Sequence, residues 1–146
     1  MNTKIFKQGA VATVMTFILP AITAGEDAKD AASPSLLVEL NRAQDQANGC
    51  LLSLYAANQT GVDIKALVLE AVLINTEGQV DRLTLFNLGQ LPDGRPRVRQ
   101  FEISEMACSN LGMMLINGIA TCEADDKGIC ERELRMRSRE AIEVAG

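Results

Sequence analysis

The sequence contains no histidine and no tryptophan, and its only aromatic residues are one tyrosine and four phenylalanines. Without histidine, the chain lacks the usual general base of serine and cysteine hydrolases and the commonest nitrogen ligand of catalytic metals. Its four cysteines include no C-x-x-C pair, which argues against a zinc site as well. We therefore expect no metal, no cofactor and no enzymatic activity. The core should be built from aliphatic side chains.

The first residues have the pattern of an export signal. Lys4 and Lys7 precede an uncharged apolar run of about a dozen residues, which ends in the small-residue sequence Ala21–Gly25. This run is shorter than the roughly 17 to 25 residues that cross a bilayer as a helix, so we expect no stable membrane insertion. The pattern predicts that residues 1–24 are removed, with cleavage after Ala24. No twin arginine precedes the run, which favours the general secretion route over the route for folded proteins. No cysteine directly follows the cleavage region, which argues against a lipid-anchored product.

Removal of that signal would leave a small acidic domain. It takes away two lysines and no acidic residue, so 12 basic and 19 acidic residues remain and the net charge becomes −7. Such a chain is not expected to bind nucleic acid or an anionic membrane nonspecifically. Residues 25–35 are polar with short side chains and predict a disordered leader. Residues 36–146 are then enough for one domain with its own core.

All four cysteines lie in the predicted mature part: Cys50, Cys108, Cys122 and Cys130. An even number in an exported domain predicts disulfides, and with them a periplasmic or secreted protein. Three pairings are possible, and sequence alone does not choose among them. We favour Cys50 with Cys108 and Cys122 with Cys130, because turn-forming residues between the last two could bring them together. In the loop-entropy model the long link would contribute about 4 kcal/mol and the short one about 2.5 kcal/mol.

Apolar alternation with a period of two, broken by turn residues, dominates the mature sequence and predicts antiparallel strands. We expect six or seven strands in an all-β, immunoglobulin-like antiparallel β-sandwich with a short C-terminal helical segment. The alternative is a small α+β domain, in which the segment around Cys108 and the charged tail are true helices. The expected strands are 36–40, 50–57, 66–74, 80–88, 95–103 with a bulge near Gln100, and 113–121, followed by a helical stretch within 131–140 and a short edge strand at 141–144.

Much of the mature chain is similar to a known group of proteins. The residues that carry the similarity are Cys50, Leu67–Leu73, Gly78, Leu91–Phe101, Cys108 and Leu115–Gly118. On these residues, the stretch from Leu36 to Cys122 resembles small exported proteins of Rhodobacter-like alphaproteobacteria, which are described as carrying a Tat signal. The missing twin arginine departs from that label. The group has no assigned activity, so the resemblance implies an exported domain and supplies no mechanism.

Two short turn motifs are similar to those of another class. Asn58-Gln59-Thr60-Gly61 and Glu77-Gly78 resemble turns in the immunoglobulin-like modules of bacterial envelopes. The similarity implies a sandwich fold and says nothing about a ligand.

The most unusual feature is a row of arginines. Arg95, Arg97 and Arg99 alternate along one predicted strand, so we expect all three guanidinium groups on the same face of an otherwise acidic protein. They are a candidate binding site for an envelope protein or an anionic ligand, because arginine forms bidentate bonds to carboxylates and phosphates. The alternative is a solvated edge strand that its charges protect against aggregation, paired with Asp81 or Glu102.

Acidic residues suggest two further possibilities. Glu70 alone interrupts the most apolar run and, if buried, could serve acid or base catalysis, although the simpler interpretation is that it faces solvent or pairs with an arginine. Glu123, Asp125 and Asp126 offer oxygen ligands for calcium, yet their spacing does not match a calcium-binding loop. A second group of arginines alternates with acids and predicts local ion pairs; it comprises Arg132, Arg135, Arg137 and Arg139.

The leading hypothesis from these patterns is a non-catalytic periplasmic interaction or accessory domain. It would present the arginine row or an uncovered strand edge to another protein. The alternative is a small-molecule or cell-wall binding module that uses the outer face of the strand at 66–74. A cavity beside Val68, Val72 and Ile74 would favour that alternative, and a flat surface there would count against it.

Overall fold

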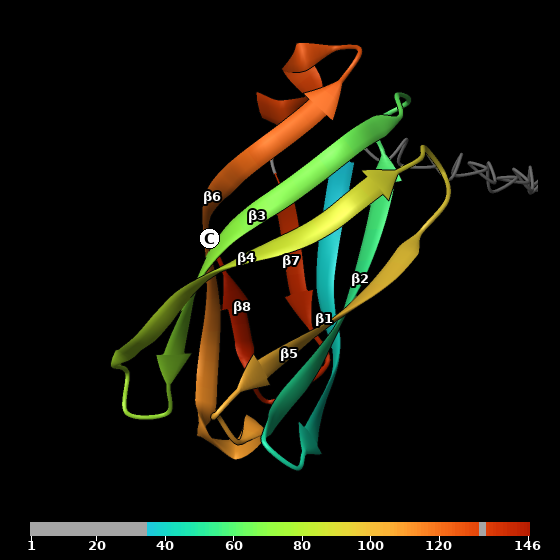
Figure 1. The fold of residues 1–146 in the computed structure, drawn as a ribbon. Helices are drawn as coiled ribbons and strands as arrows, with labels where there is room; N and C mark the ends of the chain where they lie inside the picture. Colours follow the sequence, from blue (N-terminus) through green and yellow to red (C-terminus); the bar gives the residue numbers. More distant parts are fainter. Residues whose placement is uncertain (1–34, 132–133) are drawn as a thin grey trace, which may run out of the picture. The chain divides into compact units, whose positions relative to one another are not determined.

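The computed structural model describes residues 35–131 and 134–146. These residues form two packed four-stranded sheets with two short 3-10 turns, η1 and η2, and no longer helix (Figure 1). The all-β sandwich is therefore confirmed and the α+β alternative is wrong. In chain order the elements are β1 (Ser35–Gln46), β2 (Gly49–Gln59), β3 (Ile64–Asn75), β4 (Val80–Leu91), β5 (Arg97–Ser104), η1 (Cys108–Asn110), β6 (Leu111–Ala124), η2 (Lys127–Glu131), β7 (Leu134–Ser138) and β8 (Glu143–Ala145).

Each sheet is built around two long central strands. Sheet A has the order β5-β2-β1-β7, and sheet B has the order β4-β3-β6-β8. The pairs among β1 to β6 are antiparallel, as expected. The last two strands differ, because β7 pairs with β1 and β8 with β6 in parallel. The chain passes from one sheet to the other after β2, β4, β5, β6 and β7, so the two sheets are covalently connected at several points.

The core lies between the sheets and is mainly aliphatic. In β3, every second residue from Leu67 to Leu73 is fully buried, while Val68 and its alternates are half-buried on the outer face. Phe86 of β4 is the only aromatic side chain among the fully buried residues described, and its ring packs against that of Phe101 at a centroid distance of 4.8 Å. The period-two pattern of the sequence thus reflects one face turned toward the other sheet.

The expected bulge near Gln100 is wrong. β5 pairs with β2 in an unbroken register from Arg97 to Ser104. Val98 and Phe101 are an odd number of residues apart, so a regular strand already places them on opposite faces. No extra residue is needed to reconcile the two halves of β5.

The expected helical stretch in the charged tail is also wrong. Residues Leu134–Ser138 form β7, in which Leu134 and Met136 are half-buried while Arg135 and Arg137 are exposed. The apolar residues repeat every second position, and pairing with β1 buries that face, which outweighs the helical propensity of the charged residues. Among the residues of this region that the structure describes, helical structure is limited to η2, and the short edge strand expected after it is present as β8.

The remaining boundaries shift by a few residues. β1 begins at Ser35, the last residue assigned to the leader, and continues to Gln46 through a register shift between Leu40 and Arg42. The polar bend expected after residue 40 is therefore only a turn at 47–48. The helical turn expected around Cys108 is present as η1.

Both favoured disulfides are present, and all four cysteines are bonded. Cys50 is fully buried on the inner face of β2, and Cys108 lies in η1 immediately before β6. This link therefore joins sheet A to the segment that enters sheet B. The second link, Cys122–Cys130, spans 8 residues and connects β6 to η2. Such bonds indicate an oxidising environment.

Candidate functional site

The arginine row does not lie on one exposed strand face. Arg97 and Arg99 belong to β5, where they are half-buried and alternate with the exposed Val98. They share the inward face with Phe101 and Ile103 and lie at the start of the strand. Arg95 precedes β5 and is exposed. The expectation that all three arginines share one strand face therefore holds for Arg97 and Arg99 and is wrong for Arg95, which is not part of the strand.

The guanidinium groups of this region bind backbone carbonyls. Arg99 Nε donates to Leu88 O of β4 at 3.0 Å, and Arg97 Nη1 donates to Pro96 O at 3.1 Å. A fourth arginine, Arg82 of β4, donates from Nη1 to Ser104 O at 3.0 Å. Arg99 and Arg82 thus connect β4 and β5, the edge strands of the two sheets on the same side of the sandwich.

The carboxylates expected beside the arginine row are arranged differently. Asp81 pairs with its neighbour Arg82 at 2.5 Å, and no ion pair to the arginine row is found within residues 35–131 and 134–146. In the described hydrogen bonds, β4 and β5 are joined from Arg82 to Ser104 O and from Arg99 to Leu88 O. Of the three arginines predicted to bind a ligand, Arg99 joins β5 to β4, whereas Arg97 donates to the carbonyl of its neighbour Pro96.

Glu70 lies half-buried on the outer face of β3. Its carboxylate accepts a hydrogen bond from Asn117 Nδ2, and its cross-strand neighbours are Leu85 and Gly118. A second carboxylate is not among these contacts. The arrangement removes the main reason for assigning acid or base chemistry to Glu70, because such chemistry depends on burial or on a coupled carboxylate.

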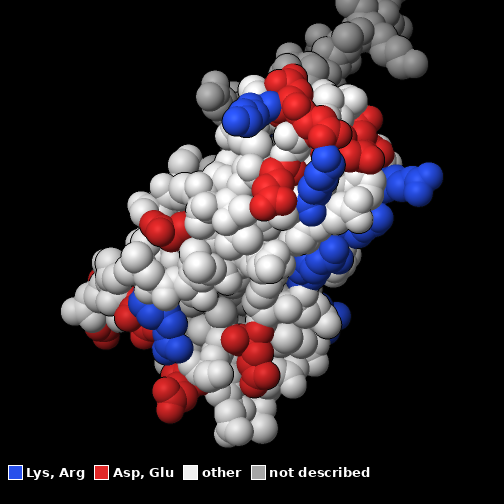
Figure 2. Space-filling view, turned by 45° about the horizontal axis from the view of Figure 1, so that its top comes forward, with Lys and Arg blue, Asp and Glu red and all other residues white. Residues whose placement is uncertain are grey.

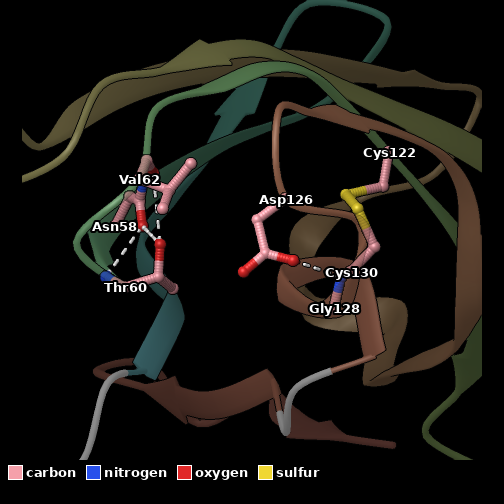
Figure 3. The surroundings of a disulfide bond; sticks show 7 residues. All are labelled: Asn58, Thr60, Val62, Cys122, Asp126, Gly128 and Cys130. Carbon is pink, nitrogen blue, oxygen red and sulfur yellow. Dashed lines mark hydrogen bonds between the residues drawn. A yellow bond between two sulfur atoms is a disulfide. The ribbon is translucent and has the colours of Figure 1, made fainter.

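The acidic loop after β6 is occupied by local contacts. Asp125 forms an ion pair with Lys65, which raises the pKa of the lysine, mainly through their hydrogen bond. Asp126 accepts a hydrogen bond from the Gly128 amide at 2.9 Å (Figure 3). Within the described part of the chain, no three acidic or cysteine side chains converge in a way that suits a metal ion.

The outer face of sheet B carries an apolar surface that covers three adjacent strands. We call it the outer B face; its residues are Val68, Val72, Ile74, Leu83, Leu85, Met113 and Leu115. Leu83 and Leu85 are 63% and 59% exposed, and Leu83 lies directly opposite Val72 of β3. On the other side of β3, Val72 pairs with Leu115 of β6. The exposed leucines therefore continue into half-buried aliphatic side chains across the sheet.

Figure 2 displays this side of the molecule, on which β3, β4 and β6 lie in front in Figure 1. A broad area of uncharged side chains crosses it, and lysine and arginine side chains form a line along one border. Within the apolar residues, the charged side chain on β3 is Glu70, and at the β8 edge Glu143 lies opposite Met113. A contiguous apolar surface of this kind marks an interaction site more often than a single exposed side chain does.

The cavities of the described residues lie elsewhere. A shallow depression of about 530 Å³ is lined by the β1–β2 turn and by residues 104–107. A smaller one of about 270 Å³ lies between the β3–β4 turn and Glu105. Another of about 420 Å³ lies between β7 and β8. None of these three is lined by Val68, Val72 or Ile74, so the observation that would favour a small-molecule site on β3 is missing there.

Sequence reasoning missed a buried polar centre at the end of β2. Asn58 is 1% exposed, and its Nδ2 donates to Val62 O and to Leu91 O, both at 2.8 Å. Its Oδ1 accepts from Thr60 N at 3.1 Å and from Thr60 Oγ1 at 2.7 Å (Figure 3). The Asn58 backbone carbonyl also accepts from Gly94 N at 2.8 Å. The motif expected to form a simple turn therefore joins the β2–β3 loop to the β4–β5 loop.

One member of the second arginine group, Arg139, forms a long-range ion pair. Arg139 Nε donates to Glu39 Oε1 of β1 at 2.7 Å, and the Glu39 side chain is only 8% exposed. This hydrogen bond is the largest cause of the lowered pKa of Glu39, followed by the one from Asn41. The same contact raises the pKa of Arg139. Arg132, also predicted to form an ion pair, lies outside the described residues.

No helix within residues 35–131 and 134–146 is long and apolar enough to cross a membrane. Comparisons of the chain with protein-family models, with curated proteins and with solved structures give no match. The geometry of the outer B face, the arginine-bonded edge and the disulfides is therefore the basis for a functional assignment.

Proposed function

We propose that this chain is a non-catalytic interaction domain of the periplasm or the extracellular space, which binds another protein through the outer B face. One observation carries the proposal: Leu83 and Leu85 are each about three-fifths exposed within a continuous apolar sheet face. Burying a leucine fully is worth about 1.5–3 kcal/mol, so covering the exposed part of both would contribute about 2–4 kcal/mol to binding.

The compartment follows from the sulfur chemistry and the sequence pattern. Two disulfides support an oxidising environment. The apolar run after Lys4 and Lys7 supports export with loss of residues 1–24. The resemblance to exported proteins of alphaproteobacteria agrees with this location and remains a prediction.

The charges on the outer B face define the chemistry of the partner. Glu70 and Glu143 are acidic, while Lys65 at the end of β3 is already paired with Asp125. The predicted mature chain is acidic overall. The complementary surface is therefore apolar at its centre with a basic or hydrogen-bond-donating group opposite Glu70. Within the arginine row, Arg99 bonds β5 to Leu88 O of β4, so we propose the outer B face, and not the arginine row, as the binding surface.

Site-specific photo-crosslinking tests this proposal. A photoreactive residue at Val72 should capture a protein from extracts of the source organism, and the same residue at Tyr55, half-buried on the outer face of sheet A, should not. The captured protein, once identified and purified, is then titrated calorimetrically with the unmodified chain and with Val72→Arg and Tyr55→Arg. We expect Val72→Arg to weaken binding at least about tenfold, because it places a cation where an apolar and basic surface docks.

Equal affinities of the two variants for the purified protein would refute the outer B face as its binding site. Capture from neither position, in an extract where the chain is folded and oxidised, would refute the interaction function itself. A small-molecule function would instead appear as saturable binding of a low-molecular-weight compound that survives Val72→Arg.

A further inference from the structure

The free edge of β4 is the least protected strand edge that continues the outer B face. β4 is the outermost strand of sheet B, and on the side away from β3 no strand of the described residues pairs with it. The six residues from Arg82 to Asn87 pair with β3 without a register shift, whereas shifts occur on both sides of this stretch. The central part of the edge is therefore regular and extended.

The protection of this edge is confined to its two ends. Arg99 donates to Leu88 O beyond one end, and Arg82 donates to Ser104 O at the other. Between them, from residue 83 to residue 87, the strand contains no proline and no charged residue. Natural proteins usually protect a long edge strand with charges, proline or bulges along its length. An unprotected central stretch is suited to pairing with another strand.

We propose that two copies of this chain pair through β4, antiparallel and centred on Thr84, so that their B sheets join into one. In this register Leu83 of each copy lies opposite Leu85 of the other, which gives two leucine pairs on the outer face. Arg82 lies opposite Phe86 on the inner face, and Asp81 lies opposite Asn87. The pairing buries the two most exposed leucines of the strand against each other.

Side-chain alternation selects this centre over its neighbours. Residues that lie opposite each other in two paired strands point to the same face of the sheet, and side chains alternate between faces along a strand. The two-fold axis that relates two antiparallel copies must therefore pass through a residue and not between two residues. Centring on Leu83 would place Leu85 opposite Asp81, and centring on Leu85 would place Leu83 opposite Asn87. Each of those alternatives pairs one leucine with its own copy and leaves the other opposite a polar side chain, whereas the Thr84 centre gives both leucines of each copy a leucine partner.

The charge pattern favours a second copy over an unrelated strand. In the Thr84 register no two like charges of β4 lie opposite each other, although the chain as a whole is acidic. The strand is thus complementary to itself. The contact is narrow compared with standard interfaces, so we expect a dimer that dissociates on dilution from millimolar to micromolar concentration.

Sedimentation velocity of the folded, oxidised chain tests the pairing. The unmodified chain should sediment as a dimer at millimolar and as a monomer at micromolar concentration. Leu83→Glu should raise the dissociation constant at least about tenfold, because it sets two carboxylates against leucines. Val98→Glu is the matched control: Val98 is 56% exposed, but it lies on β5 of the other sheet, so this variant should behave as the unmodified chain. A dimer that is equally sensitive to both substitutions would overturn the proposal.

Cysteine cross-linking tests the register without changing the outer face. Paired antiparallel residues have Cα atoms about 4.5–5.5 Å apart, within the range that a disulfide spans. Thr84→Cys should therefore oxidise to a covalent dimer, while Asn87→Cys, which would face Asp81, should not. Peptide mapping under non-reducing conditions would verify that the native disulfides are intact. A monomer at every concentration together with no Thr84→Cys dimer would overturn the pairing. Partner capture through Val72 would be unaffected by that result, so the two proposals fail separately.

Discussion

Replacement of Asn58 by alanine should be among the most destabilising single changes in this domain. The side chain makes four hydrogen bonds in a buried position and connects two loops that lie far apart in the sequence. After truncation, Val62 O would still accept from Thr60 Oγ1 at 3.2 Å. Leu91 O and Thr60 N would lose their side-chain partner, and their contacts with Asn58 are buried.

The magnitude follows from these two orphaned groups. A buried polar group left without a partner costs about 1–3 kcal/mol, so the loss of two partners in Asn58→Ala should lower the free energy of unfolding by about 2–6 kcal/mol. That is a large part of the roughly 5–15 kcal/mol that stabilises a typical domain. Asn58→Asp should cost at least as much, because it keeps the acceptor for Thr60 but turns an oxygen toward Val62 O and Leu91 O.

Urea unfolding of the oxidised protein, followed by circular dichroism, measures both effects. The midpoint should fall while the slope with urea stays constant, since the surface exposed on unfolding hardly changes. Gln59→Ala, at the exposed neighbouring position, should shift the free energy by no more than about 0.5 kcal/mol. A loss below about 1 kcal/mol for Asn58→Ala would refute the reasoning, because it would mean that water replaces the amide at this site.

Further predictions concern the ion pair, a close backbone contact and the arginine-bonded edge. Arg139 lowers the pKa of Glu39, so the ionised carboxylate stabilises the fold above about pH 4.5, and this stabilisation is lost as the pH falls through the lower pKa of the folded state. Glu39→Gln should therefore flatten the acid side of a curve of unfolding free energy against pH. An unchanged curve would contradict this. Gly49→Ala would place a Cβ atom too close to Ile103 O, so β2 and β5 would have to separate. We expect the free energy of unfolding, measured by thermal denaturation, to fall by at least about 2 kcal/mol. An unchanged Tm would count against the packing described. Arg99→Met removes the bond to Leu88 O and should cost about 1 kcal/mol in urea unfolding, with a gain in stability as the contrary result.

The arginine row shows what alternation can and cannot decide. The spacing of Arg97 and Arg99 correctly places them on one face of a strand. Alternation alone does not say which of the two faces turns inward, and Phe101 and Ile103 on the same face as the arginines settle this only once β5 is paired with β2. Arg97 and Arg99 are half-buried on that inward face, which suits arginine because its aliphatic stem can pack while its charged head stays in water.

The tail and the outer leucines also depend on tertiary contacts that the local sequence does not show. Charge and helical propensity suggested a helix at 131–140, but burial of Leu134 and Met136 against β1 made residues 134–138 a strand. The sequence placed Leu83 and Leu85 on the face opposite Phe86, and nothing local showed that this face would be left uncovered. The exposure that supports an interaction function is a property of the assembled sheets.

The sequence by itself determined the elements that depend on local periodicity and covalent chemistry: the presence of six strands between residues 36 and 121, though not all of their ends, the turn at Gly78, and the all-β class. It also favoured, without proving, the pairing of Cys50 with Cys108 and of Cys122 with Cys130. Only the tertiary structure decided which strands meet, which faces stay exposed, and that Asn58 is a buried junction between loops. The physical reason is that alternation and turn preference act between neighbours in the chain, whereas burial and hydrogen-bond satisfaction depend on residues brought together from distant segments.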